Sequence, residues 1–384
     1  MIKYAAPVVL AAILAGCGSE SNVSRGEAAL ASGDYAEAAR LFASALKTNP
    51  TSVPLLYNLG AARAMAGDTR GAIAAFRDAL RCSPGEIEVS EYLADQLAKT
   101  GTPEALAEAR ELLDFSIPFR SEPVAKARAL NSIALVEMSL RHYDLALAHL
   151  VAAISAAPDY PPAHYDLAVL CKSTLGLPAA AARELEAFLN AGGQDGERAA
   201  KAREMLAELK KSLPAPYSHK TSDAASELLR SGAELYDKKD FAKAVKLFSE
   251  ASLKDPFSFD AYFNAANAHL AVGKYREAYE SFLQASSINP SRFDAAFWAA
   301  RLAYANGDFK TAVKDLTAKI IPSWPDEAES YLLAAYAFAQ ERRYIEARAF
   351  GELFLAKSKD EDPAGKVKDF KLWLETLPET RFRP

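Results

Sequence analysis

Cysteine is scarce in this chain, which limits the chemistry that the chain can support. Its 384 residues include three cysteines, at positions 17, 82 and 171. Cys82 and Cys171 lie in different segments, and neither belongs to a Cys-x-x-Cys motif, so no redox pair is indicated. We expect both to be buried, unpaired thiols. A disulfide between them is the alternative in an oxidising compartment.

Catalytic signatures are missing as well. The sequence contains no HExxH, GxSxG or GxGxxG motif and no phosphate-binding glycine loop. Its five histidines are spread along the chain, at positions 142, 149, 164, 219 and 269. We expect them on the surface or lining a groove, with a metal site as the alternative, and we expect Glu184 and Glu186 to face solvent. The prediction is a protein without catalytic activity, metal or cofactor. An enzyme would need a site assembled from residues distant in sequence.

An excess of positive charge and long apolar runs are also lacking. The formal net charge is −5, from 45 Lys and Arg against 50 Asp and Glu, so the chain has no electrostatic footprint for nucleic acid or an anionic membrane. Beyond residue 17, no apolar run approaches the ~20 residues of a membrane-spanning helix. We therefore expect no nucleic-acid partner and no spanning segment.

What the chain does contain is a pattern repeated every 34 residues. Its clearest copies place small residues, phenylalanines and prolines at the same offsets. Ala244, Phe248, Ala251 and Pro256 recur as Ala278, Phe282, Ala285 and Pro290, and Gly232 recurs as Ala266. The small residues allow two helices to approach closely, the phenylalanines fill the space between them, and the prolines end each unit because they lack an N–H group.

This pattern resembles the tetratricopeptide repeat, and the resemblance implies two antiparallel helices per unit, stacked into an all-α solenoid. Similar units cover nearly the whole chain after residue 17. We predict about five repeats plus a capping helix in residues 18–212, a proline-containing linker at 213–222, about four repeats plus a second capping helix in 223–377, and a tail at 378–384. One unbroken superhelix is the alternative. Residues 320–325 are expected to form a proline-bracketed loop.

The first 17 residues have the pattern of a lipoprotein signal peptide. Lys3 precedes an apolar run, which ends in Leu14-Ala15-Gly16-Cys17 and resembles a bacterial lipobox. The resemblance implies cleavage before Cys17 and lipid, such as palmitate, on that cysteine, so that the protein is anchored to the membrane by lipid alone. By the sorting rule known for enterobacterial lipoproteins, Gly18 and Ser19 imply the outer membrane, facing the periplasm. The alternative is an ordinary signal peptide with an incidental cysteine.

The first helices of the repeats are expected to line a groove. Ala296, Ala299, Ala300 and Ala303 form a small-residue stripe that should be buried, while Phe297, Arg301 and Tyr304 share a different face. By resemblance to peptide-binding tetratricopeptide domains, that face looks into the concave surface. The same offsets in neighbouring units complete the predicted partner-binding set, which is Tyr236, Phe263, Asn264, Asn267, Phe297, Arg301, Tyr304 and Tyr336. The alternative is that the aromatic members pack between adjacent repeats.

These features predict a non-catalytic, lipid-anchored scaffold of the bacterial cell envelope. It would bind partner proteins or extended peptides in its groove, in secretion, pilus or outer-membrane assembly. The alternative is a structural envelope protein that self-associates or binds the cell wall. The sequence leaves the partner and the oligomeric state open.

Overall fold

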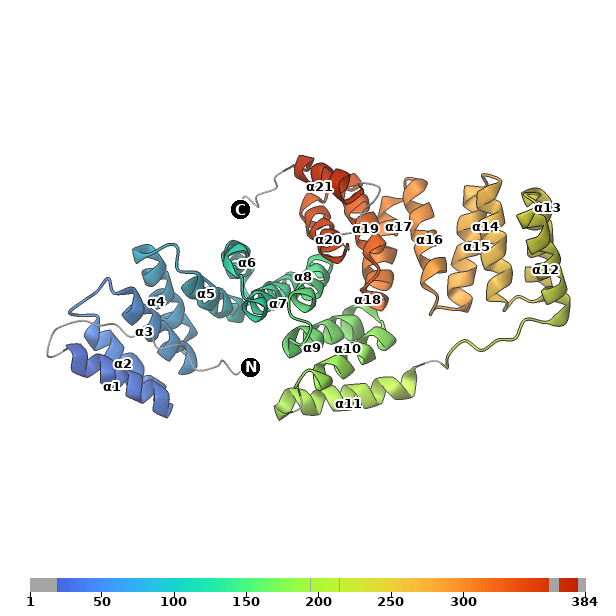
Figure 1. Ribbon diagram of the computed structural model, residues 1–384. Coiled ribbons are helices and arrows are strands. Elements are labelled where there is room, and N and C mark those ends of the chain that lie inside the picture. The colour runs from blue at the N-terminus through green and yellow to red at the C-terminus, as the bar shows by residue number, and fades with distance from the viewer. Residues whose placement is uncertain (1–18, 194, 214, 359–365, 379–384) are drawn as a thin grey trace. The chain divides into compact units, whose positions relative to one another are not determined.

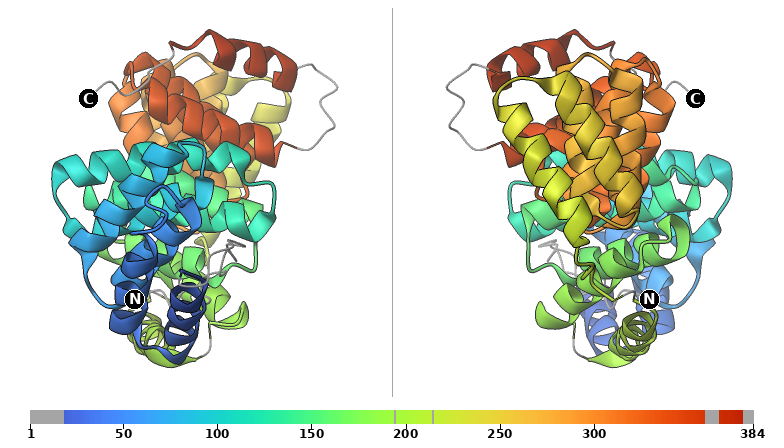
Figure 2. Two further views of the ribbon diagram at one scale, coloured as in Figure 1. Left: turned by 90° about the vertical axis from the view of Figure 1, so that its left-hand side faces the viewer. Right: turned by 90° about the vertical axis from the view of Figure 1, so that its right-hand side faces the viewer.

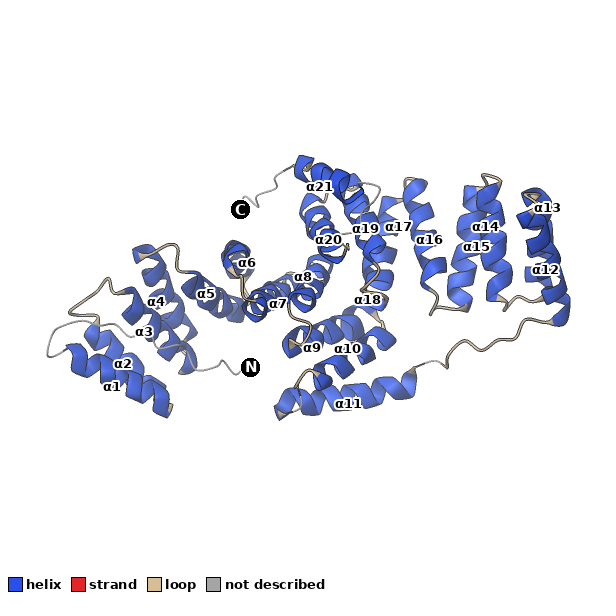
Figure 3. Cartoon of the chain, viewed as in Figure 1, coloured by secondary structure: helices blue, strands red, loops and turns tan. Residues whose placement is uncertain are grey.

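Helices form all the regular structure in the part of the chain that is described. The computed structural model describes residues 19–193, 195–213, 215–358 and 366–378. Within these segments there are helices and connecting loops and no strand (Figure 3). The predicted all-α class is therefore confirmed. The predicted leader and Cys17 lie outside the described residues.

The chain divides into two compact units, Met1–Ala163 and His164–Pro384, which we call unit 1 and unit 2. The division falls within one helix, Pro161–Leu170, rather than at the expected linker 213–222, which lies inside unit 2. The boundary predicted at residues 213–222 separates two blocks of repeats and not two compact units. It therefore stays a prediction.

Unit 1 consists of successive helical hairpins. Each odd-numbered helix from α1 to α7 packs against the next helix along the chain. Its helices are α1 (Ser19–Ser32), α2 (Tyr35–Ala45), α3 (Val53–Met65), α4 (Thr69–Cys82), α5 (Ile87–Thr100), α6 (Pro103–Ser116), the 3-10 helix η1 (Ile117–Phe119), α7 (Pro123–Ser139) and α8 (Tyr143–Ala156).

Unit 2 begins with α9 (Pro161–Leu170), η2 (Cys171–Leu175), α10 (Pro178–Asn190) and α11 (Gly196–Ser212). After the linker, hairpins stand side by side in a row, with α12 and α13 nearest the viewer in the right-hand view of Figure 2 (Figures 1 and 2). This part comprises α12 (Asp223–Asp237), α13 (Phe241–Lys254), α14 (Phe259–Ala271), α15 (Tyr275–Ile288), α16 (Phe293–Ala305), α17 (Phe309–Asp315), η3 (Leu316–Ile320), α18 (Ile321–Ser323), α19 (Ala328–Gln340), α20 (Tyr344–Lys357) and α21 (Lys366–Thr376).

The turn inside each hairpin requires a residue with positive φ. Glycine supplies it in most hairpins, as at Gly67 with φ 82° and Gly307 with φ 81°. In three hairpins Arg141, Lys239 and Arg342 adopt φ of 60–63° instead. A side chain in this region costs free energy, so the packing of the two helices must determine the turn there.

An aromatic ring held against a small residue forms the core of the regular hairpins. Phe248 on α13 is 2% exposed and packs against Gly232 on α12. A Cβ atom at Gly232 would lie 2.6 Å from the Phe248 ring, and one at Gly60 would lie 2.5 Å from the ring of Phe76. Glycine at these positions therefore permits the close helix approach that the repeat pattern predicted.

Two hairpins contain a π-helical turn. One is η2, which directly follows α9 and ends at the turn residue Gly176. In the eighth repeat, the expected loop at residues 320–325 is wrong in its first part, because η3 and α18 keep residues 316–323 helical. The π turn resets the hydrogen-bond register, so that Pro322 falls at the start of α18, where no N–H donor is needed.

The core packing makes a prediction that compares two phenylalanines. Replacing the buried Phe248 by alanine should lower the free energy of unfolding by about 3–5 kcal/mol, because it removes the ring that fills the α12–α13 hairpin. Chemical denaturation with circular dichroism measures the change. The matched control is Phe257→Ala, at a ring that is 68% exposed, and its effect should stay within about 0.5 kcal/mol. Equal losses in the two variants would contradict this account of the core.

Candidate binding cleft

The orientation of α16 follows from its alanine stripe. Ala296, Ala299, Ala300 and Ala303 are at most 5% exposed, which confirms the predicted buried face. Small side chains let neighbouring helices approach this face closely. The opposite orientation would bury Arg301, which is exposed. The stripe therefore determines which side chains α16 presents to the groove.

A cleft of about 570 Å³ lies over the first helices of the last two repeats and the capping helix α21. Phe297, Arg301 and Tyr304 line it from α16, and Tyr336 lines it from α19. These are four of the eight residues predicted to bind a partner. The helix α21 lies where the second capping helix is predicted, and it contributes Trp373 to the lining.

Aromatic side chains form the wall of the cleft at α19 and α21. The ring centroid of Tyr336 lies 4.5 Å from that of Trp373 and 5.5 Å from that of Phe370. Phe370 is 2% exposed and also packs edge-on against Phe354, at 4.9 Å. Such contacts hold the rings rigidly, so this wall offers ordered apolar surface at low entropic cost.

Charged side chains of both signs line the cleft. Arg301 and Lys366 are basic, while Glu329 and Asp369 are acidic. Among the described residues, none of the four forms an ion pair; the guanidinium of Arg301 lies 4.8 Å from the ring centroid of Trp298. The charges are therefore available to groups on a partner.

The phenol of Tyr336 lies near Tyr304 and Asp369, which line the same cleft. Burial raises the pKa of this phenol, and the nearby Tyr304 and Asp369 raise it further. The hydroxyl is therefore neutral at physiological pH and can both donate and accept a hydrogen bond.

The other predicted partner-binding residues lie outside this cleft. Phe263 packs within its own α14–α15 hairpin, with ring centroids 5.3 Å from Phe259 and 5.5 Å from Phe282. Asn267 donates to the Phe263 carbonyl of its own helix at 3.1 Å, and Tyr236 packs against Phe241 in its own hairpin. Asn264 is half-buried beside Phe263. The structure thus brings Phe297, Arg301, Tyr304 and Tyr336 together and leaves these four apart.

Gly351 explains why the cleft ends where it does. The repeat pattern places an aromatic residue at this position of a second helix, yet α20 has glycine there. A Cβ atom at Gly351 would lie 2.7 Å from Leu374 Cδ1 and 3.2 Å from the ring of Phe370. The missing side chain makes room for α21, which takes the place of the next first helix. This departure from the repeat was the available signal for the contribution of α21.

Three expectations about buried groups are wrong. His164 and Glu184 are buried and paired, with His164 Nδ1 2.8 Å from Glu184 Oε2, rather than facing a groove or solvent. Burial alone would raise the pKa of Glu184, but His164 and Arg183 hold it below its ordinary value. Arg183 also donates to the carbonyl groups of Pro322 and Ser323. Cys82 is exposed, whereas Cys171 is buried as expected.

The histidine at position 149 is also more buried than expected. Burial, reinforced by the nearby Arg110, lowers the pKa of His149 to about 4. The ring is therefore neutral at physiological pH, and it is half-buried in unit 1. Across the described segments, no three His, Cys, Asp or Glu side chains come together as metal ligands would. None of the helices described has the length and apolar character needed to cross a membrane.

Comparison with protein families identifies the repeat. The family model described as "Tetratricopeptide repeat" matches residues 23–87, 229–285, 263–328 and 299–364, which together make up more than half of the chain. Its matches on α12 to α20 include the first helices that line the cleft. No curated protein sequence matches the chain.

A search of solved structures finds similarity to proteins that include the following three. The MamA protein is 19% identical, with 51% of this chain and 97% of that chain covered and a TM-score of 0.40. PilW, described as a type IV pilus biogenesis factor, is 16% identical, with 71% and 94% covered and a TM-score of 0.40. A tetratricopeptide repeat protein from Parabacteroides merdae is 14% identical, with 84% and 100% covered and a TM-score of 0.31. Similarity at this level carries no information about function.

The role of Gly351 can be tested by filling its space. Gly351→Leu should displace α21, because the new side chain overlaps Leu374 and Phe370, at a cost of roughly 1–3 kcal/mol. In a Trp298→Phe, Trp324→Phe background, where Trp373 is the remaining tryptophan, fluorescence should shift to longer wavelength as Trp373 enters water. Gly85→Leu is the control, since nothing lies within 4 Å of a Cβ atom there. An unshifted spectrum in Gly351→Leu would show that α21 packs in some other way.

Proposed function

The chain belongs to the tetratricopeptide-repeat family, and from that premise we propose that it is a non-catalytic scaffold, anchored by lipid in the bacterial cell envelope, which holds partner proteins or extended peptides in the α16–α19–α21 cleft. Proteins of this fold generally mediate protein–protein interactions. The observation that supports the location is the convergence of Phe297, Arg301, Tyr304 and Tyr336, residues of successive first helices, on one cleft.

The chemistry of the cleft suits a peptide rather than a small metabolite. Tyr304, Tyr336 and Trp373 provide aromatic surface for an apolar side chain of the partner. Arg301 is exposed and forms no ion pair with another residue that the structure describes, so it can bind a carboxylate through two parallel hydrogen bonds. Glu329 and Asp369 can accept from a basic side chain on the same segment. A peptide that presents an apolar anchor flanked by charges matches all three features.

The envelope location is proposed from residues 1–19 of the sequence. Lipid on Cys17 would hold the protein at the membrane, and the residues that follow favour the outer membrane with the repeats in the periplasm. Secretion, pilus and outer-membrane assembly are the proposed settings for such a scaffold. The second candidate function, a structural protein that binds the cell wall, is favoured by one separate observation, the uncharged cleft described in the next subsection.

The groove proposal predicts the effect of a double substitution. Arg301→Glu with Tyr304→Ala should leave the repeats folded, because Arg301 is exposed and Tyr304 is half-buried, yet weaken partner binding by about 2 kcal/mol or more, roughly thirty-fold. Cross-linked co-purification from intact cells measures this as the selective loss of one envelope protein. Thermal unfolding checks that the repeats remain intact.

A matched double variant controls for charge and size. Arg276→Glu with Tyr275→Ala alters the same residue types on α15, outside the cleft, where Tyr275 is 56% exposed. It should retain the protein that the cleft variant loses. Recovery of identical proteins from both variants would refute the cleft assignment, and a collapsed melting transition in the cleft variant would assign Arg301 and Tyr304 to the core.

The anchor has its own test. Cys17→Ser removes the thiol that lipid attachment requires, so the protein should leave the membrane fraction and lose metabolic labelling with palmitate. Cys82→Ser, which removes an exposed thiol within the repeats, should change neither result. Membrane association that persists in Cys17→Ser would contradict the lipobox interpretation.

A further inference from the structure

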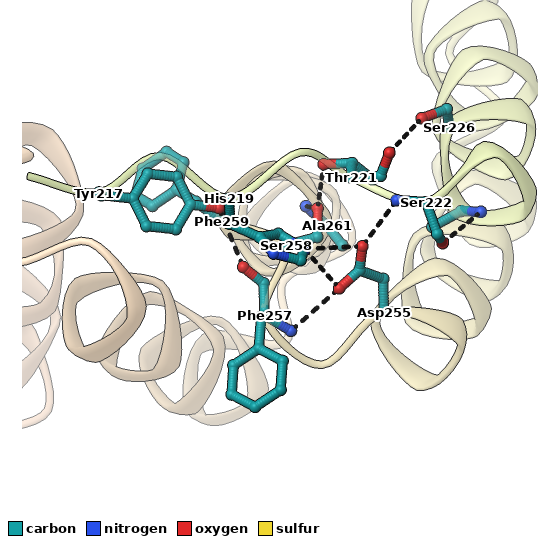
Figure 4. Close-up of polar contacts among 11 residues, drawn as sticks. Tyr217, His219, Thr221, Ser222, Ser226, Asp255, Phe257, Ser258, Phe259 and Ala261 are labelled. Atoms are coloured by element: carbon teal, nitrogen blue, oxygen red, sulfur yellow. Dashed lines mark hydrogen bonds and ion pairs between the residues drawn. The ribbon is translucent and has the colours of Figure 1, made fainter.

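A second cleft in unit 2 lies outside the first-helix groove. Its volume is about 670 Å³, within the range of roughly 300–1,000 Å³ typical of small-molecule sites. Linker residues 217–219 form one side, and the turn between α13 and α14 forms another. The end of α15, with Gln284 and Ser287, completes the lining. Figure 4 shows the linker side chains facing the turn.

The linker is held against the turn by specific hydrogen bonds. The carboxylate of Asp255 accepts from the Ser222 N–H at 2.8 Å and lies 2.9 Å from His219 Nε2 (Figure 4). Burial alone would raise the pKa of Asp255, but the N–H groups of Ser222 and Phe257, together with the His219 ring, lower it. The group is therefore a carboxylate at neutral pH, and it ties the linker to the turn through Ser222 and His219.

The same contacts use up the main-chain groups of the turn. The Tyr217 hydroxyl donates to the Phe257 carbonyl at 2.9 Å and accepts from the Phe259 N–H at 3.2 Å. The Phe257 N–H donates to Asp255. An extended peptide binds to an edge chiefly through main-chain hydrogen bonds. This turn has few left to offer, so peptide addition is disfavoured here.

Aromatic rings remain open on the cleft surface. The His219 ring centroid lies 6.3 Å from Tyr217 and 6.1 Å from Phe257. Phe257 lies in the turn between α13 and α14, and its side chain is 68% exposed. Other repeats have Thr51, Gly85, Asp159 or Ser291 at the position after the turn proline. The repeat fold therefore does not explain this exposed ring.

The polar groups of the cleft are almost all uncharged. The Gln284 amide and the Ser218 hydroxyl are exposed, and neither has a side-chain hydrogen bond to another described residue. His219, the one titratable group in the lining besides the tyrosine hydroxyl, is paired with Asp255. This differs from the first-helix cleft, whose lining includes four charged side chains with no ion pair to another described residue.

We propose that this cleft binds a neutral oligosaccharide. The apolar face of a sugar ring would stack on Phe257, as apolar ligand surface does on aromatic side chains. The Gln284 amide and the Ser218 hydroxyl would exchange hydrogen bonds with the sugar hydroxyl groups. The proposal is independent of the peptide cleft on α16, α19 and α21.

Titration of the purified full-length chain with two neutral trisaccharides tests the proposal. One is an N-acetylglucosamine trimer, which has the acetamido groups of cell-wall glycan, and the other is maltotriose, which has only hydroxyl groups. Saturation-transfer NMR and calorimetry measure binding. At least one trisaccharide should bind, and Phe257→Ala or Gln284→Ala should weaken its binding at least ten-fold.

Control variants and ligands distinguish specific sugar binding from nonspecific binding. Leu253→Ala removes an 81% exposed side chain from the neighbouring helix α13 and should leave the affinity unchanged. Circular dichroism should show that Phe257→Ala remains folded. The proposal fails if neither trisaccharide binds at millimolar concentration, or if Phe257→Ala binds as well as the unaltered protein. It also fails if a proline-rich peptide or an anionic oligosaccharide occupies the cleft in preference to both neutral sugars. None of these outcomes bears on the Arg301 and Tyr304 variant, so the two proposals fail separately.

Discussion

The packing of one phenylalanine against one small residue in each regular hairpin is the contact on which this structure depends. Phe42, Phe76, Phe248 and Phe282 are all buried to within 2% exposure. Three of them face a glycine so closely that a Cβ atom there would lie 2.5–2.8 Å from the ring. This contact sets the separation of the two helices within a unit. A single hairpin leaves its remaining apolar face uncovered, so the units must stack.

Stacking places the first helices of successive repeats next to one another, and the cleft on α16, α19 and α21 follows from that. The alanine stripe of α16 is buried against neighbouring helices, so that Phe297, Arg301 and Tyr304 lie on the cleft side. Gly351 then admits α21 as the last member of the row. The groove is thus a consequence of how small residues are distributed. Phe297 is only 8% exposed and stacks on Phe293, so the accessible chemistry of the groove comes from Arg301, Tyr304 and Tyr336.

Much of the fold could be predicted from the sequence because the repeat is local. The 34-residue period and the alanine stripe of α16 depend on contacts within or between adjacent hairpins, and both expectations are confirmed. Four of the eight predicted partner-binding residues share one cleft. Phe263 does not, because it packs against Phe259 and Phe282 within its own α14–α15 hairpin.

What the sequence did not reveal depends on contacts between distant segments. Glu184 reads as a solvent-facing residue of an amphipathic helix, yet His164 pairs with it from α9, and Arg183 beside it bonds to carbonyl groups of α18 about 140 residues away. The linker reads as an extended spacer, yet Tyr217 and His219 bind the turn at 255–259 and enclose a second cleft. Neither of these contacts produces a periodic pattern in the sequence.

The central claim is that a partner lies in the first-helix cleft of unit 2, and site-specific photo-cross-linking tests it most directly. A photoreactive amino acid at position 332, where Leu332 lines the cleft from α19, would be compared in living cells with the same group at position 253, which is exposed on α13. The account predicts one discrete cross-linked envelope protein from position 332 and none from position 253. The same adduct from both positions, or one from position 253 alone, would contradict it.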